Sequence, residues 1–141
     1  MPKITCEDFN KILESEMSWA SDLGMRLEHI ESGLGTMRLP YHHSSTRPGG
    51  TISGPHMMML ADACMYAVVL GLIGPVKLAV TTNFNINFLR KPAETDLLAE
   101  GKIIKLGKRL AIMEVSIATD NGGELVAHAT GTYSIPPVTV G

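Results

Sequence analysis

The chain has 141 residues, a length that suits one domain with a hydrophobic core. Hydrophobic residues make up 45% and charged residues 18%, and the formal net charge is -2, so no strongly basic surface indicates a nucleic-acid partner. Cys6 and Cys64 lack the spacing of a metal site, which fits a reducing cytosol. The N-terminal residues carry early acids and no long apolar run, which argues against a signal peptide. We therefore expect a single cytoplasmic domain over residues 1–141.

The first forty residues predict a short helix followed by a hairpin. Thr5 and Asp8 match a helix-capping pair, and apolar residues then recur at helical spacing, so residues 5–19 are predicted as an amphipathic helix. Apolar and charged residues alternate over residues 24–31 and again over 34–41, which predicts two strands joined by a turn.

A second helix is predicted from about residue 53 to residue 74, and it is apolar on almost every side. Ser53 is a good N-cap, Pro55 suits the first turn, and Gly74 fits the end. The apolar stretch falls short of the roughly 20 residues of a membrane span and contains Asp62, so we interpret it as a core helix. A helix of this kind must be wrapped by protein.

The last half of the chain predicts four strands. Residues 80–89 alternate, which puts Thr82 and Phe84 on one side of the strand and Thr81 and Asn83 on the other. Further strands are predicted at 96–106, 110–119 and 125–135, separated by turn-forming residues at 107–109 and 120–123.

These elements predict an α+β domain in which an antiparallel sheet of about six strands wraps one long apolar helix, with a short N-terminal helix added. One sheet covers only part of such a helix, and a second copy of the chain would cover the rest. We therefore expect a homo-oligomer, either a dimer or a tetramer, and neither a nucleic-acid nor a membrane partner.

Four motifs together resemble the hotdog-fold acyl-CoA thioesterases, in the branch that includes the phenylacetate-pathway thioesterase. They extend over most of the chain, in the family's order, at residues 50–62, 80–93, 107–111 and 127–133. The resemblance implies the hotdog fold, an acyl-CoA substrate, and hydrolysis of its thioester to a free acid and coenzyme A. Coenzyme A is then part of the substrate, and no separate cofactor or metal is expected.

The chain departs from the family's pattern at the start of the long helix. Ser53-Gly54-Pro55 stands where the family usually has His-Gly-Gly, and Arg47 stands where an asparagine is common. The central glycine and the later acid, Asp62, are retained. Roles of the family's histidine or asparagine side chains therefore do not carry over.

Thioester hydrolysis needs a group that delivers the nucleophile and a donor that holds the developing oxyanion. The backbone N–H of Gly54, at a helix N-terminus, is the candidate donor. Asp62 is the candidate base or nucleophile, and it needs hydrogen-bonding partners in its apolar surroundings. Thr81 matches a family position that orients water or the acid. Each also has a structural reading: a turn glycine, a buried structural acid and a strand threonine.

Gly54 and Asp62 are eight residues apart, which is about 12 Å along a helix. One helix cannot easily place both on the same carbonyl group, whereas two helices that meet across a dimer axis can. The resemblance implies the same arrangement, with the glycine from one subunit and the acid from the other.

The remaining candidates are predicted substrate contacts. Basic residues near strand ends are candidates for the phosphates of coenzyme A, and residues of the loop, helix and central strand are candidates for the acyl end. The set comprises Arg47, Ser53, His56, Met58, Tyr66, Asn83, Arg90, Lys91, Lys105, Lys108 and Arg109. His42 and His43 could bind a metal, but no third ligand has suitable spacing, so no metal site is predicted.

Two other functions stay open from the sequence. A hotdog hydratase or dehydratase would use His56 with an acid of the partner chain and would act on enoyl-CoA without releasing thiol. A non-catalytic protein would bind acyl-CoA without turnover.

Overall fold

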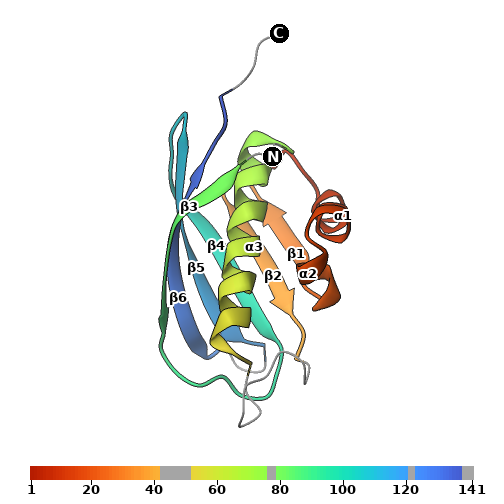
Figure 1. The fold of residues 1–141 in the computed structure, drawn as a ribbon, viewed down its shortest axis with the longest axis vertical. Helices are drawn as coiled ribbons and strands as arrows, with labels where there is room; N and C mark the ends of the chain where they lie inside the picture. The colour runs from red at the N-terminus through yellow and green to blue at the C-terminus, as the bar shows by residue number, and fades with distance from the viewer. Residues whose placement is uncertain (42–51, 76–78, 121–122, 138–141) are drawn as a thin grey trace.

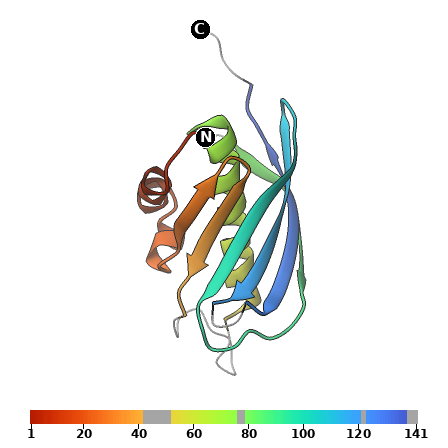
Figure 2. The same cartoon turned by 180° about the vertical axis from the view of Figure 1, so that it is seen from behind.

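The structure is a computed structural model, and it describes residues 1–41, 52–75, 79–120 and 123–137. An antiparallel six-stranded sheet, in the order β1-β2-β4-β5-β6-β3, curves around one long helix (Figures 1 and 2). This is the α+β arrangement that the sequence predicts. The helices are α1 (Cys6–Glu16), α2 (Ser18–Asp22) and α3 (Gly54–Ile73), and the strands are β1 (Arg26–Glu31), β2 (Leu34–Leu39), β3 (Val80–Phe88), β4 (Leu97–Leu106), β5 (Leu110–Thr119) and β6 (Leu125–Ser134).

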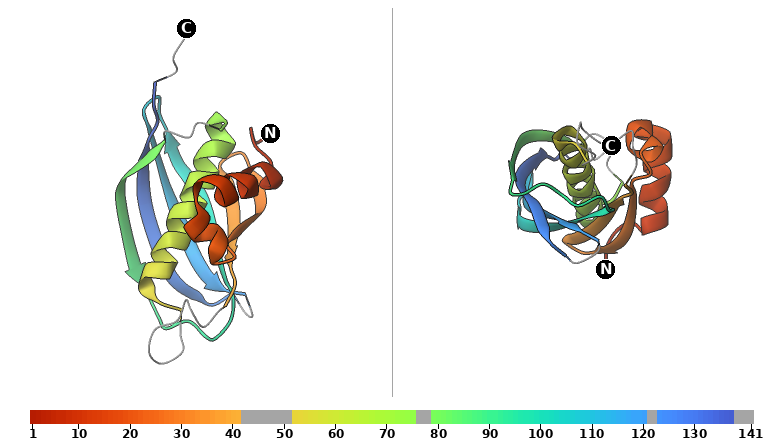
Figure 3. Two further views of the ribbon diagram at one scale, coloured as in Figure 1. Left: turned by 45° about the vertical axis from the view of Figure 1, so that its right-hand side comes forward. Right: turned by 90° about the horizontal axis from the view of Figure 1, so that it is seen from below.

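The N-terminal helix is broken where the sequence predicts continuity. The capping pair forms, because the Thr5 hydroxyl accepts from the Asp8 N–H and the Asp8 carboxylate accepts from the Thr5 N–H, both at 3.0 Å. Met17 then adopts φ -132° and ψ 57°, outside the helical region, and ends α1. The short helix α2 follows and carries Trp19, and both helices lie beside β1 (Figure 3, left).

The long helix α3 fills the hollow of the sheet. Ser53 caps its first turn, a proline lies in that turn, and Gly74 ends it with φ 92°, a conformation that glycine adopts readily. By length and composition alone, α3 could cross a membrane, and it is the one such helix in the described part of the chain. It is mostly buried within the fold, as a core helix is.

Glycines in the sheet let α3 approach closely. A Cβ on Gly101 of β4 would lie 2.9 Å from Cys64 Sγ and 3.1 Å from Val68 Cγ2, and one on Gly131 of β6 would lie 2.6 Å from Met65 Sδ. All three helix side chains are fully buried. The close packing of α3 on the sheet therefore requires glycine, which has no side chain, at these two positions.

We expect Gly101→Ala to lower the free energy of unfolding by about 1–3 kcal/mol, because the added methyl group overfills a closed contact. Urea denaturation of the wild-type and variant proteins measures the difference. Gly107→Ala is the matched control, since a Cβ there meets only the Leu110 carbonyl oxygen at 3.5 Å. Equal losses in the two variants would contradict this account of the packing.

Strand β3 forms one edge of the sheet and contains a bulge, so the strict alternation predicted for this strand is wrong near its start. Its register against β6 shifts between Thr81, which pairs with Tyr133, and Asn83, which pairs with Thr132. The extra residue puts Thr81, which contacts Asp62 of α3, on the opposite face of β3 from Asn83, although the alternation predicted that these two residues share a face. Phe84 lines the cavity beside Asp62, so its neighbour Asn83, a predicted substrate contact, lies on the opposite face of β3, away from Asp62.

Candidate functional site

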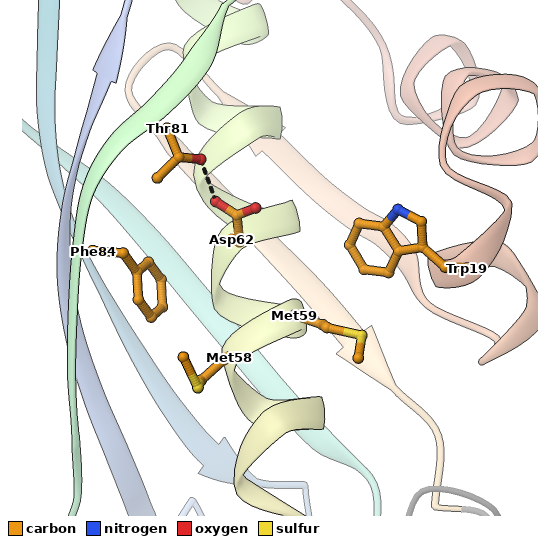
Figure 4. A pocket seen from close by; sticks show the side chains of 6 residues that line it. All are labelled: Trp19, Met58, Met59, Asp62, Thr81 and Phe84. Carbon is orange, nitrogen blue, oxygen red and sulfur yellow. Dashed lines mark hydrogen bonds between the residues drawn. The ribbon is translucent and has the colours of Figure 1, made fainter.

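Asp62 lies near the middle of α3, and two hydroxyl groups hold its carboxylate. Thr81 Oγ1 donates to Asp62 Oδ1 at 2.7 Å, and Tyr133 Oη donates to the same oxygen at 2.8 Å. Tyr133 Oη also contacts the Asp62 main-chain carbonyl oxygen at 3.0 Å. Figure 4 shows the second carboxylate oxygen turned away from Thr81, toward the side of α3 that faces Trp19. Among the described residues, no group donates to this Oδ2 atom.

The sequence prediction that Asp62 needs hydrogen-bonding partners is therefore confirmed, but one partner was missed. Tyr133 lies 71 residues from Asp62 and reaches it only because the register pairs Tyr133 with Thr81. Burial, followed by the neighbouring Asp62 charge, raises the pKa of Tyr133 well above its usual value of 10. The phenol therefore keeps its proton and acts as a donor.

A cavity of about 500 Å³ opens next to this carboxylate. Among the described residues, its polar lining consists of Asp62 and Thr81, and its apolar lining comes from three elements (Figure 4). Met58 points toward Phe84 on β3, and Met59 lies on the side of Trp19 from α2. The four apolar side chains among the described lining residues are Trp19, Met58, Met59 and Phe84.

A second hollow, of about 330 Å³, lies on another side of the same carboxylate. It is more polar and is lined partly by Glu16, Tyr66 and Tyr133. The ring of Tyr66 stacks on that of Tyr133 with centroids 6.2 Å apart. Tyr66 and Met58, both predicted substrate contacts, thus lie beside Asp62, in different hollows.

The start of α3 carries the second predicted group. Gly54 is the first helical residue, and helical geometry leaves the N–H at this position without an intrahelical acceptor. The hydroxyl of Ser53 caps the helix and contacts His56 Nδ1. A Cβ on Gly54 would lie 3.2 Å from Phe88 Cζ, so the Phe88 ring covers this turn. Asp62 lies more than two turns away on the same helix, and one chain does not bring the two groups together.

The predicted phosphate contacts lie in two places. Lys105, Lys108 and Arg109 line a hollow of about 370 Å³ at the β4–β5 turn. This turn is at the same end of the sheet as Thr81, because Leu110 and Val80 both pair with Ser134.

The other two basic candidates follow β3 at its far end. Arg90 is half exposed and contacts Glu124 at 3.7 Å, and Lys91 is exposed. Neither residue lines the hollows beside Asp62 within one chain.

Two sets of candidates fall outside the described residues: Arg47, and the pair His42 and His43. Within the described ranges, no group of three His, Cys, Asp or Glu side chains is arranged to hold a metal ion.

Comparison with known proteins now identifies the family. The family model for the thioesterase superfamily matches residues 49–126, which include both Gly54 and Asp62. The chain belongs to the thioesterase superfamily. A protein of Saccharolobus solfataricus named a "putative esterase" is 30% identical over 95% of this chain and 87% of its own length.

Solved structures agree with the fold. A crystal structure from Silicibacter titled a "putative thioesterase" has a TM-score of 0.88 and 37% identity over 97% of this chain and 95% of that one. A thioesterase from Haemophilus influenzae has a TM-score of 0.87 over 99% of this chain and 96% of that one, but only 20% identity, and so supports the fold alone. The hotdog fold and thioesterase family predicted from the motifs are confirmed, and membership of this family supports a hydrolase activity.

Proposed function

We propose that the protein hydrolyses an acyl-CoA thioester, with Asp62 as the group that activates or delivers the nucleophile. The observation that carries this proposal is the arrangement of the Asp62 carboxylate. Both hydroxyl donors bind Oδ1, and Oδ2 faces an apolar cavity that can hold an acyl chain. A carboxylate fixed by one oxygen and open at the other suits a general base or a nucleophile.

The oxyanion donor in this proposal comes from a second copy of the chain. Thr81, near one end of β3, contacts Asp62, and Phe88, at the other end, covers Gly54. Two copies of β3 paired antiparallel about an axis near Phe84 would place Thr81 of one copy opposite Phe88 of the other. Asp62 would then lie next to Gly54 of the second copy, at a distance that one helix cannot provide.

The free edge of β3 supports this pairing. The strand has nine residues, and among the described strands only β6 pairs with it. An unpaired edge of this length is a template for another strand. Val80 and Phe88 also expose large apolar surfaces there, 56% and 49% of their areas. A dimer would cover both the edge and the open side of α3.

The reaction then follows from the two groups. Asp62 Oδ2 takes a proton from water, whose oxygen attacks the thioester carbonyl carbon, or attacks that carbon itself to give an anhydride that water cleaves. The carbonyl oxygen becomes an oxyanion next to the Gly54 N–H of the second copy, where the α3 dipole also favours negative charge. The C–S bond breaks, and coenzyme A leaves as its thiolate, which gains a proton.

The basic residues supply the coenzyme A end of the site. Lys105, Lys108 and Arg109 lie at the Thr81 end of the sheet, and the proposed pairing would bring Arg90 and Lys91 of the second copy to that same end. A cationic rim here suits the pyrophosphate and 3′-phosphate groups.

An acyl-CoA panel followed by thiol release tests the proposal. We expect free thiol and free acid in equal amounts from at least one saturated acyl-CoA. Absorbance loss on enoyl-CoA without thiol would instead indicate the hydratase chemistry of His56, and binding without turnover across the panel would indicate a non-catalytic protein.

Tyr133→Phe removes one of the two donors to Asp62 and leaves the ring in place. We expect kcat to fall about tenfold, in line with the loss of one hydrogen bond to a charged group, while KM changes little. Steady-state kinetics with the best substrate of the panel measures both constants. An unchanged kcat, or a rise in KM alone, would contradict the positioning role of Tyr133.

A further inference from the structure

The single tryptophan of the chain lies at the candidate site, on an element that the family match does not include. Trp19 belongs to α2, and the family model matches only residues 49–126. Its neighbour Ala20 is fully buried and anchors α2, whereas Trp19 keeps 40% of its surface exposed. A large apolar side chain left uncovered beside a cavity is a typical feature of a binding wall.

The cavity has an apolar part and a reactive end. Met58 and Phe84 line one flank, Met59 and Trp19 line the other, and Asp62 lies between them, with Thr81 on the β3 side (Figure 4). Thr81 already donates to Asp62, so its hydroxyl hydrogen is not available to a ligand. Among the described lining residues there is no cation.

These observations restrict the acyl group, given the proposed thioester hydrolysis on which this step rests. A thioester carbonyl beside Asp62 Oδ2 directs its acyl chain between the two apolar flanks. An apolar chain buries its surface there, and each added CH₂ group increases the favourable free energy of binding. A chain that ends in a carboxylate would lose water without gaining a cation and would also be repelled by Asp62.

We infer that the site takes uncharged, apolar acyl groups longer than acetyl, and that Trp19 is a specificity-determining residue that forms the outer wall of the acyl pocket. The N-terminal segment therefore contributes directly to substrate choice. The break at Met17 positions it, because α2 begins there as a separate helix next to α3.

Hexanoyl-CoA and adipoyl-CoA test the substrate class, because both have six acyl carbons and differ only in a terminal carboxylate. We expect kcat/KM to be at least about tenfold higher for hexanoyl-CoA, and also higher for hexanoyl-CoA than for acetyl-CoA. Equal or faster turnover of adipoyl-CoA, or a preference for acetyl-CoA, would overturn the inference while leaving thioester hydrolysis intact. Thiol release from no acyl-CoA at all would instead end the proposed function.

Trp19→Ala tests whether Trp19 forms a wall of the acyl pocket, through the preference of the enzyme for a long over a short acyl chain. We expect the ratio of kcat/KM for hexanoyl-CoA over acetyl-CoA to fall about tenfold, and Trp19→Phe to restore most of it. Leu125→Ala is the matched control, since Leu125 is also 40% exposed and does not line the cavity, and it should keep the wild-type ratio. Equal losses on both substrates in Trp19→Ala would mean that Trp19 only supports the fold.

Fluorescence gives a readout that needs no turnover. In an Asp62→Asn variant, hexanoyl-CoA should change the emission of Trp19 in a saturable manner, and free coenzyme A at the same concentrations should change it much less. Emission that does not respond to hexanoyl-CoA would contradict contact between the acyl group and Trp19.

Discussion

Asp62→Asn is expected to lower kcat for thioester hydrolysis by about 10³-fold, within the range found for loss of a general base. The asparagine keeps an oxygen that can accept from Thr81 and Tyr133, so the contacts at this position persist in the variant. What it loses is the anionic Oδ2 that faces the cavity. The thermal midpoint should therefore stay close to the wild-type value.

Steady-state thiol release and a thermal melt by circular dichroism measure the two effects. Retention of a tenth or more of the wild-type kcat would contradict the assignment of Asp62. Loss of activity together with unfolding would instead indicate the structural reading of this acid, in which its hydrogen bonds serve only to join α3 to β3 and β6.

Gly54→Pro is expected to lower kcat by about 10²-fold, because proline has no N–H to hold the oxyanion. Gly54 is the first residue of α3, where proline is favoured, and the preceding Ser53 has φ -71° and ψ 155°, which a following proline permits.

Gly54→Ala is the matched control for this variant. It keeps the N–H and adds a Cβ 3.2 Å from Phe88 Cζ, a contact that the half-exposed ring can relieve. Steady-state kinetics should therefore give Gly54→Ala much more activity than Gly54→Pro. Equal activities in the two variants would show that this N–H does not stabilise the transition state.

Local patterns in the sequence predict most of the fold. The cap at Ser53, the proline in the first turn and the glycine at residue 74 locate α3 to within a residue, because each satisfies a local requirement of a helix end. The hairpin turns likewise locate β4, β5 and β6. The break at Met17 was not predicted, since apolar spacing continues through it and no proline or glycine interrupts the pattern.

The composition of the site depends more on tertiary structure. Asp62 stands out in sequence as an acid in an apolar helix, and Thr81 was predicted beside it. The alternation wrongly placed Asn83 on the same face as Thr81, because a bulge is invisible to a pattern of period two. Tyr133 was missed because its partner is distant in the chain. One sequence feature could have indicated it: Tyr133 is a large side chain that follows three small ones, Ala127, Ala129 and Gly131, at alternate positions of the strand.

The shared site is the central claim, and mixed dimers of Asp62→Asn and Gly54→Pro subunits test it most directly. Co-expression with two different tags and purification through both isolates dimers that contain one subunit of each variant. We expect about half of the wild-type activity for these dimers, because one of the two sites keeps both Asp62 and Gly54. Mixed dimers no more active than either parent variant would contradict a site built from two chains.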